Sequence, residues 1–197
     1  MADTRETIMA VARATVQAHG YGGLSFRELA KAVGVKSASI HYHFPTKADL
    51  GAALARRYRE DAKAGLEDIW EQSHDPAQAL RLYANVFRRA LENDNRMCMC
   101  GFMAAEHDDL PEPVKAEVKA FADVNVAWLA KVLSATDGRC DPETIESRAL
   151  ALFAAISGAQ LTARSRGDVA VFDRIVDSYR AAGLMPSQSD FKSRGIT

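Results

Sequence analysis

Residues 25–47 read SFRELAKAVGVKSASIHYHFPTK, and this stretch decides the predicted fold. Its apolar residues fall on one face of each of two short predicted helices, 25–33 and 36–44, with Gly34 between them. Glycine adopts the backbone conformation of a sharp turn at little steric cost. Two short amphipathic helices joined by such a turn are typical of the helix-turn-helix, whose second helix enters the major groove of DNA.

The second of these helices presents a polar outer face. We expect Val35, Ile40 and Phe44 to point inward. The side chains then left outward or at the flanks are Lys36, Ser37, Ser39, His41, Tyr42 and His43. These groups can hydrogen-bond base edges or phosphates, and none is a carboxylate that would repel DNA. Lys47 starts the next predicted helix, where its ammonium and the first-turn amides can hold a phosphate, and the amides after Ser25 can do the same.

The rest of the chain predicts an all-α fold. Apolar residues recur at three and four residues, and no run of β-branched residues alternates with period two. Capping pairs and first-turn prolines mark helix starts, namely Ser25 with Glu28, Thr46 with Asp49, Asp75 with Gln78, Pro76 and Pro142. We expect about nine helices, near residues 5–19, 25–33, 36–44, 47–73, 76–92, 98–106, 112–135, 142–165 and 169–182. Residues 187–197 are polar and are expected to fray.

Composition excludes several classes of protein. The chain has 197 residues, of which 48% are hydrophobic and 26% charged, with net charge −1, and this balance excludes a disordered protein. Residues 1–59 nevertheless hold nine Lys and Arg against four acidic residues, so the N-terminal third is basic and the remainder acidic. The sequence shows no secretory signal, and its longest uncharged stretch, 149–163, is too short to span a bilayer. We expect a soluble cytoplasmic protein with no membrane partner.

Residues 5–50 resemble the N-terminal DNA-binding domain of the TetR family of bacterial transcriptional regulators. The resemblance is carried by Gly20-Tyr21, Gly34-Val35, Ile40, Tyr42-His43-Phe44 and Lys47. It implies that Ser37, Ala38 and His41 face bases of double-stranded operator DNA. It also implies that Tyr42 and Lys47 hold phosphates, while His43 contacts the DNA backbone or buttresses the turn. The family often has Gly where Ala38 stands and Tyr where His41 stands, so the operator sequence does not transfer.

The resemblance also implies a homodimer formed by the last two long helices. The predicted helix 142–165 is apolar on two faces, and both must be covered. One stripe holds Ile145, Ala149, Leu152, Ile156, Ala159 and Ala163, and the other holds Leu150, Phe153, Ala154, Ser157 and Leu161. The predicted dimer contacts are Leu152, Ala155, Ile156, Gly158, Ala159, Phe172, Ile175 and Tyr179. The alternative is that one monomer core covers both faces.

A small-molecule effector is a further implication of the resemblance. Large, deformable apolar residues lie between the predicted DNA-binding and dimer segments. The predicted ligand contacts are Phe87, Met97, Cys100, Met103, Phe121 and Trp128, and ordinary core packing is the alternative for each. We therefore predict a repressor that a ligand releases from a palindromic operator. Its predicted parts are a DNA-binding domain at 1–48, a ligand-binding and dimerisation domain at 49–185, and a polar tail at 186–197.

Cys98 and Cys100 leave three interpretations open. They could bind zinc with His107, although side chains at these spacings diverge on a helix, or sense oxidants or electrophiles, or lie buried and inert. The segment resembles a Cys-x-x-Gly-x-x-Ala-Ala-Glu pattern of many family members, which favours a structural role for Cys98. No phosphate loop, nucleophile elbow or HExxH motif is present, so we predict no catalytic residues, metal or cofactor. A helical adaptor or an enzyme without DNA binding remains an alternative, and the basic third disfavours the adaptor.

Overall fold

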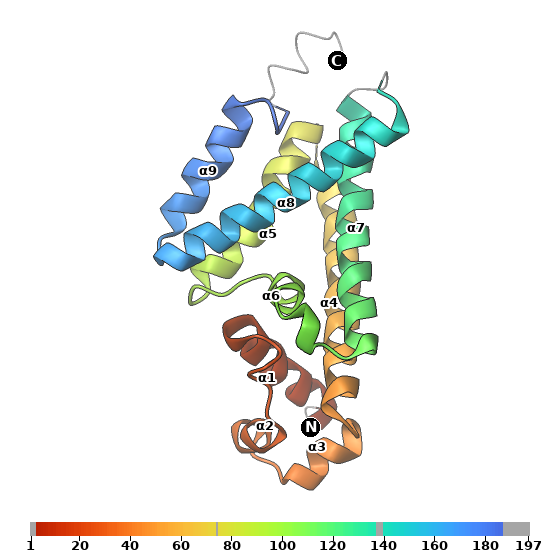
Figure 1. The fold of residues 1–197 in the computed structure, drawn as a ribbon, viewed down its shortest axis with the longest axis vertical. Helices are drawn as coiled ribbons and strands as arrows, with labels where there is room; N and C mark the ends of the chain where they lie inside the picture. The colour runs from red at the N-terminus through yellow and green to blue at the C-terminus, as the bar shows by residue number, and fades with distance from the viewer. Residues whose placement is uncertain (1–2, 74, 137–139, 187–197) are drawn as a thin grey trace. The chain divides into compact units, whose positions relative to one another are not determined.

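A computed structural model describes residues 3–73, 75–136 and 140–186, and the predicted tail 187–197 lies outside them. Within these ranges the regular structure is entirely helical, which confirms the all-α prediction (Figure 1). The α-helices are α1 (Thr4–His19), α2 (Phe26–Val33), α3 (Ser37–His43), α4 (Lys47–Gln72), α5 (Pro76–Glu92), α6 (Met99–Ala105), α7 (Glu112–Thr136), α8 (Pro142–Arg166) and α9 (Val169–Ala181). None of these helices is long and apolar enough to span a membrane.

The starts of α2 and α4 lie close to the predicted positions, because capping side chains fix them. The Ser25 hydroxyl accepts a hydrogen bond from the Glu28 amide at the start of α2. At the start of α4, Thr46 and Asp49 cap each other, since the Asp49 carboxylate accepts from the Thr46 amide at 3.0 Å and the Thr46 hydroxyl accepts from the Asp49 amide at 3.1 Å. The short 3-10 helix η1 (His107–Asp109) was not predicted, because its three polar residues carry no apolar period.

The chain forms two compact units. Unit 1 comprises the residues up to Ala62 together with Cys98–Ala122, and unit 2 comprises Lys63–Met97 together with the residues from Asp123 onward. Helices α4 and α7 each begin in unit 1 and end in unit 2. Besides the predicted DNA-binding segment 1–48, unit 1 therefore contains the start of α4, all of α6 and the start of α7.

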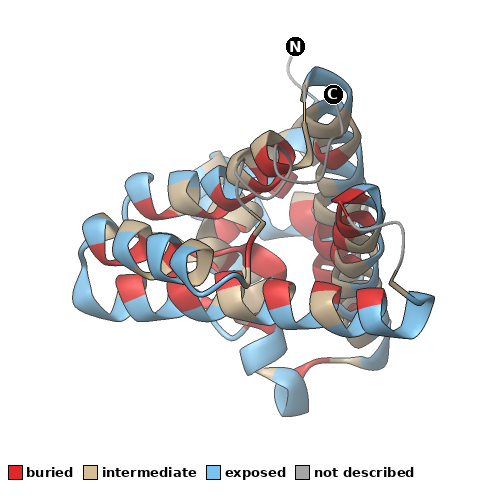
Figure 2. Ribbon diagram, turned by 90° about the horizontal axis from the view of Figure 1, so that it is seen from above, coloured by how far each residue is buried: buried red, intermediate tan, exposed pale blue. Residues whose placement is uncertain are grey.

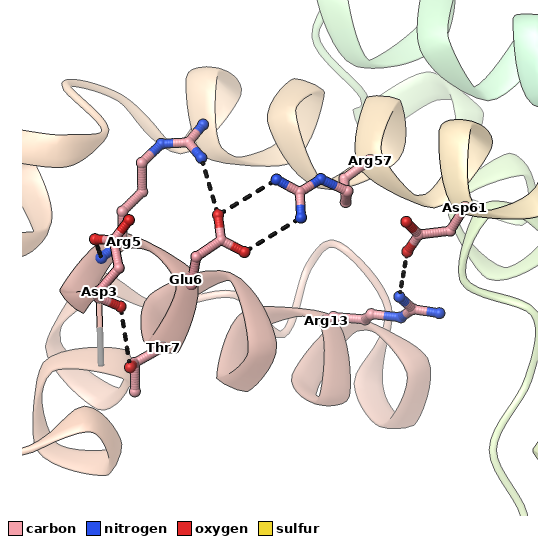
Figure 3. Close-up of polar contacts among 7 residues, drawn as sticks. All are labelled: Asp3, Arg5, Glu6, Thr7, Arg13, Arg57 and Asp61. Carbon is pink, nitrogen blue, oxygen red and sulfur yellow. Dashed lines mark hydrogen bonds and ion pairs between the residues drawn. The ribbon is translucent and has the colours of Figure 1, made fainter. Parts of the chain in front are cut away.

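Unit 1 is built around apolar side chains from its helices. Its most deeply buried members, none more than 2% exposed, include Ile8, Ala12, Val16, Leu29, Ile40 and Leu50. Ion pairs add to this packing along α1 and α4, where the Arg57 guanidinium donates to the Glu6 carboxylate at 3.2 and 3.3 Å and Arg13 donates to Asp61 at 2.9 Å (Figure 3). Exposed ion pairs are worth at most about 1 kcal/mol each. Apolar packing therefore supplies most of the stability here.

In unit 2, α8 packs against α9 and α5. Figure 2 shows that buried and exposed positions alternate along the helices. The first predicted stripe of α8 is its core face, because the exposed fraction of each of its six side chains is 4% or less. Four residues predicted for the dimer interface are thus buried inside the protomer, namely Leu152, Ile156, Ala159 and Phe172. Since their surfaces are already covered by the same chain, they are unavailable to a partner.

The second stripe of α8 is the one that faces outward. Leu150 is 52% exposed and Leu161 is 56% exposed, which is unusual for large apolar side chains. Ala154 and Gly158 between them are also exposed, and a Cβ atom added at Gly158 would meet nothing within 4 Å. Ala155, Ile175 and Tyr179, which were also predicted for the interface, are half-buried.

Candidate nucleic-acid interface

The predicted helix-turn-helix is present in unit 1. Helix α2 ends at Gly34, whose φ of 78° and ψ of 31° lie in the left-handed region that glycine favours. The amides of Gly34 and Val35 both donate to the Ala30 carbonyl, at 3.0 and 2.9 Å, which closes the turn. Helix α3 packs against the core of unit 1 through Ile40, which is fully buried. Phe44, directly after the helix, is also buried, with 3% of its surface exposed. One face of α3 is thereby fixed inward and the other is left open.

The residues predicted to contact DNA occupy this open face and its flanks. Lys36, Ser37, Ala38, His41 and Tyr42 are exposed, whereas Ser25, Ser39, His43 and Lys47 are partly exposed. Tyr42 is the most prominent of them, with 84% of its surface exposed. The His41 ring rests edge-on against Phe26, with ring centroids 4.8 Å apart, and its Nδ1 lies 3.3 Å from the Pro45 carbonyl oxygen. These contacts orient His41 on the face of α3.

Most of the basic side chains in residues 1–59 form ion pairs with neighbouring carboxylates, and seven of them share four carboxylates. Seven of the nine form ion pairs: Arg5–Glu6, Arg13–Asp61, Arg27–Glu28, Lys31–Glu28, Arg56–Glu117, Arg57–Glu6 and Arg59–Glu117. In the part of the chain that the structure describes, Lys36 and Lys47 form no ion pair with an acidic side chain. These two lysines stand immediately before and shortly after α3. The two basic side chains of this segment that have no carboxylate partner in the described ranges therefore lie on either side of α3.

Lys47 is held in place by the loop between α1 and α2. Its Nζ donates to the Gly22 carbonyl at 3.4 Å and lies 4.5 Å from the centre of the Tyr21 ring. Contact of an ammonium with the face of an aromatic ring is favourable but weak at exposed sites, about 0.5–1 kcal/mol. The ammonium is thus positioned without being neutralised.

The predicted ligand contacts are all buried, but they belong to different units. Cys100, Met103 and Phe121 are core residues of unit 1, where the Phe121 ring lies 5.4 Å from that of Tyr58. The other three predicted contacts, in unit 2, are Phe87, Met97 and Trp128. Phe87 and Trp128 both pack on the ring of Tyr83, at 5.3 and 5.5 Å between centroids.

Unit 2 also buries polar groups that the sequence pattern did not predict. The Tyr83 hydroxyl donates to the Asn125 side chain at 3.2 Å, and the Gln160 amide donates to the Phe87 carbonyl at 2.8 Å. The Trp128 indole N–H is buried with no hydrogen-bond partner among the described residues. A buried donor without a partner costs roughly 1–3 kcal/mol. The only sequence signal was that these polar residues interrupt otherwise apolar helix faces.

Cys98 and Cys100 are buried at 6% and 1% exposure. Burial raises the pKa of both thiols, and the neighbouring Cys98 raises the pKa of Cys100 further. A raised pKa reduces the thiolate fraction at neutral pH, and the thiolate is the form that reacts with oxidants and electrophiles. Within the described ranges, no group of three or more His, Cys, Asp or Glu side chains is placed to hold a metal ion. These observations favour the buried, inert interpretation.

This interpretation predicts an order of thiol reactivity. With N-ethylmaleimide at pH 7.5, we expect Cys140, which is partly exposed, to react first in the native protein. Cys98 and Cys100 should react about 100-fold more slowly than in guanidinium, because they must await local unfolding. Peptide mass spectrometry after timed quenching measures all three. Rapid native modification of Cys98 or Cys100, accompanied by loss of DNA binding, would support a thiol sensor instead.

Known proteins that are similar to this chain over most of its length are described as transcriptional regulators. A model of the family described as "Bacterial regulatory proteins, tetR family" matches residues 8–54. The structure of a TetR transcriptional regulator from Legionella pneumophila is 33% identical over 89% of this chain and 94% of its own, with a TM-score of 0.83. A TetR-family regulator from Agrobacterium tumefaciens is also 33% identical, over 87% and 93%, with a TM-score of 0.81. NemR from E. coli, in its reduced form, shares the fold at 20% identity, with 94% and 98% coverage and a TM-score of 0.80.

Proposed function

Because this chain belongs to the TetR family of bacterial transcriptional regulators, we propose that it represses transcription by binding a palindromic operator as a homodimer. A small molecule bound in the C-terminal part of the chain releases it from the DNA. Release requires that the ligand binds more tightly to the state that cannot bind DNA. The site of action is the cytoplasm, where the operator lies.

The observation that carries the DNA-binding proposal is that the two lysines without a carboxylate partner lie on either side of α3. Lys36 and Lys47, which no acidic side chain in the described ranges neutralises, flank a helix with an open polar face. We assign phosphate contacts to Lys36, Tyr42 and Lys47, and base contacts to Ser37, Ala38 and His41. Ser25, Ser39 and His43 complete the surface as contacts to the DNA backbone or as supports of the turn. Phosphate contacts fix the register of the helix, and base contacts supply the specificity.

The effector proposal is supported by the buried aromatic and sulfur-containing side chains. In unit 2, the rings of Phe87 and Trp128 pack on Tyr83, and the buried Trp128 indole N–H has no hydrogen-bond partner among the described residues. Such a group gains a hydrogen bond when a ligand brings an acceptor, so it favours a ligand with a polar atom on an apolar body. Met97, Cys100, Met103 and Phe121 remain proposed contacts on the same chemical grounds.

The test is salt-dependent binding to DNA. A fluorescent duplex covering the region upstream of the protein's own gene is titrated with protein from 50 to 200 mM KCl. We expect the binding constant to fall steeply, by about 1,000-fold or more, if the dimer releases counterions from six or more phosphates. Unchanged affinity over this range, or no binding of the duplex at 50 mM KCl, would reject the proposed function.

A further inference from the structure

We propose that Glu106 is a positioning residue for DNA binding: its carboxylate holds the loop Gly20–Gly22, and this loop in turn sets the position of Lys47. The inference rests on the proposed function, because it concerns how a proposed phosphate contact is oriented. All the residues involved lie in unit 1. Glu106 is the C-cap residue directly after α6, and it is separated from the loop by more than eighty residues of sequence.

The carboxylate of Glu106 accepts two hydrogen bonds from consecutive backbone amides. Oε2 accepts from the Tyr21 amide at 2.6 Å, and Oε1 accepts from the Gly22 amide at 3.0 Å. Hydrogen bonds to an ionised acceptor are about twice as strong as neutral ones. A single side chain therefore fixes the orientation of two successive peptide groups in a loop that has no regular structure.

The loop is shaped to receive this carboxylate. Gly20 has a φ of +74°, and a Cβ atom there would lie 2.5 Å from Oε1 of Glu106. Any other residue at this position would be strained and would push the carboxylate away from the amides. On the other side, the Tyr21 ring fits against Gly51 of α4, where an added Cβ would lie 2.6 Å from the ring. The two glycines leave room for the carboxylate and for the ring.

Lys47 depends on the same loop for its position. The Gly22 carbonyl accepts from Lys47 Nζ, and the Tyr21 ring lies beneath the ammonium. Tyr21 and Gly22, whose backbone amides donate to Glu106, are thus also the two residues that contact the lysine. Without the carboxylate, we expect the loop to move and the ammonium to lose its fixed position beside α3.

The experiment compares Glu106→Ala and Glu106→Gln with Asp108→Ala as a control. Asp108 is exposed in the adjacent 3-10 helix η1, so its variant removes the same charge from the same segment. On the upstream duplex at 100 mM KCl, we expect Glu106→Ala to bind at least about tenfold more weakly, since it loses two charge-assisted hydrogen bonds. Glu106→Gln should fall in between, because it keeps one carbonyl oxygen as an acceptor. Asp108→Ala should bind within about twofold of wild type.

A double-mutant cycle separates positioning from a general loss of stability. If Glu106 acts through Lys47, Glu106→Ala should weaken binding at least about tenfold in the wild type but no more than about twofold in a Lys47→Ala background. A variant that merely destabilises the fold would weaken both backgrounds equally. Hydrogen exchange of the Tyr21 and Gly22 amides gives an independent measurement, and we expect both amides to lose protection in Glu106→Ala while the amide of fully buried Ile40 keeps it.

The possible outcomes differ for this inference and for the proposed function. Wild-type affinity in Glu106→Ala, or equal losses in the two backgrounds, would overturn the positioning role while leaving the regulator intact. If the wild-type protein shows no salt-sensitive binding at all, the proposed function fails, and the positioning role in DNA binding falls with it. Amide protection that survives in Glu106→Ala would overturn the role even if DNA binding changed. If Glu106→Ala does not fold, Glu106→Gln is carried through the same cycle.

Discussion

The double variant Tyr42→Ala/Lys47→Ala is expected to bind operator DNA about 1,000-fold more weakly than the wild type. Each side chain contributes one proposed phosphate contact, worth about 1 kcal/mol. A symmetric dimer presents each contact twice, so about 4 kcal/mol is lost, and each 1.4 kcal/mol corresponds to a factor of ten. Neither substitution should unfold the protein, because Tyr42 is 84% exposed and Lys47 lies at the start of α4.

The salt dependence tests whether the lost contacts are ionic. Each Lys47 that neutralises a phosphate contributes nearly one unit to the slope of log affinity against log salt concentration. Lys47→Ala alone should therefore reduce the slope by about two for the dimer, whereas Tyr42→Ala, which removes no charge, should leave it nearly unchanged. Fluorescence anisotropy at four KCl concentrations measures both quantities.

The matched control is Lys63→Ala. It removes the same charge and the same length of side chain from an exposed position in α4, but in unit 2 rather than beside α3. Its affinity and its slope should stay within error of the wild type. Equal losses in Lys63→Ala and Lys47→Ala would show that only the overall charge matters, and would contradict the assignment of the DNA surface to α3.

The helix boundaries were predictable because they depend on local chemistry. Ser25, Thr46 and Asp75 each cap a helix with a side chain only three residues away from the amide it satisfies. The turn at Gly34 was predictable for the same reason, since only the left-handed conformation had to be available. The helix-turn-helix and its open polar face therefore followed from the residues themselves.

The sequence did not predict which basic side chains form ion pairs with distant carboxylates. The count of nine basic residues in 1–59 indicated a DNA-binding segment, but Arg13 pairs with Asp61, and Arg56 and Arg59 share Glu117. These partners lie outside the basic third and are brought close only by tertiary folding. The contact of Glu106 with the loop at Tyr21 was hidden for the same reason. The local pattern predicts the helix-turn-helix, whereas long-range contacts determine whether Arg13, Arg56 and Arg59 have carboxylate partners.

The faces of α8 show a second limit of sequence pattern. Both of its stripes are apolar and have helical spacing, so periodicity alone cannot say which one faces the core of the protomer. The structure buries the stripe through Leu152 and Ile156 and exposes the stripe through Leu150 and Leu161. The surface that we expect to form the dimer is therefore the second stripe together with the half-buried residues of α9.

Introducing a charge on this second stripe is expected to separate the dimer into folded monomers. Leu150 and Leu161 are eleven residues apart, close to three full turns, so they lie on the same side of α8 with exposed Ala154 and Gly158 between them. In a two-fold symmetric interface each substitution occurs twice, once in each protomer. Each substituted side chain then lies either near the two-fold axis or against the apolar surface of the partner. Leu150→Glu/Leu161→Glu would bury four carboxylates without partners, and burying such charges costs several kcal/mol each.

The matched control for this variant is Val86→Glu, which places the same charge on an apolar side chain of α5 that is 48% exposed. At micromolar concentration, sedimentation velocity should show a monomer for the double leucine variant and a dimer for Val86→Glu, with wild-type circular dichroism in both. Because a monomer engages only one half-site, we expect its affinity for the palindromic operator to fall by roughly 1,000-fold. A double leucine variant that remains dimeric and binds DNA normally would show that the second stripe is not the interface, since no dimer could accommodate four unpaired carboxylates there without loss.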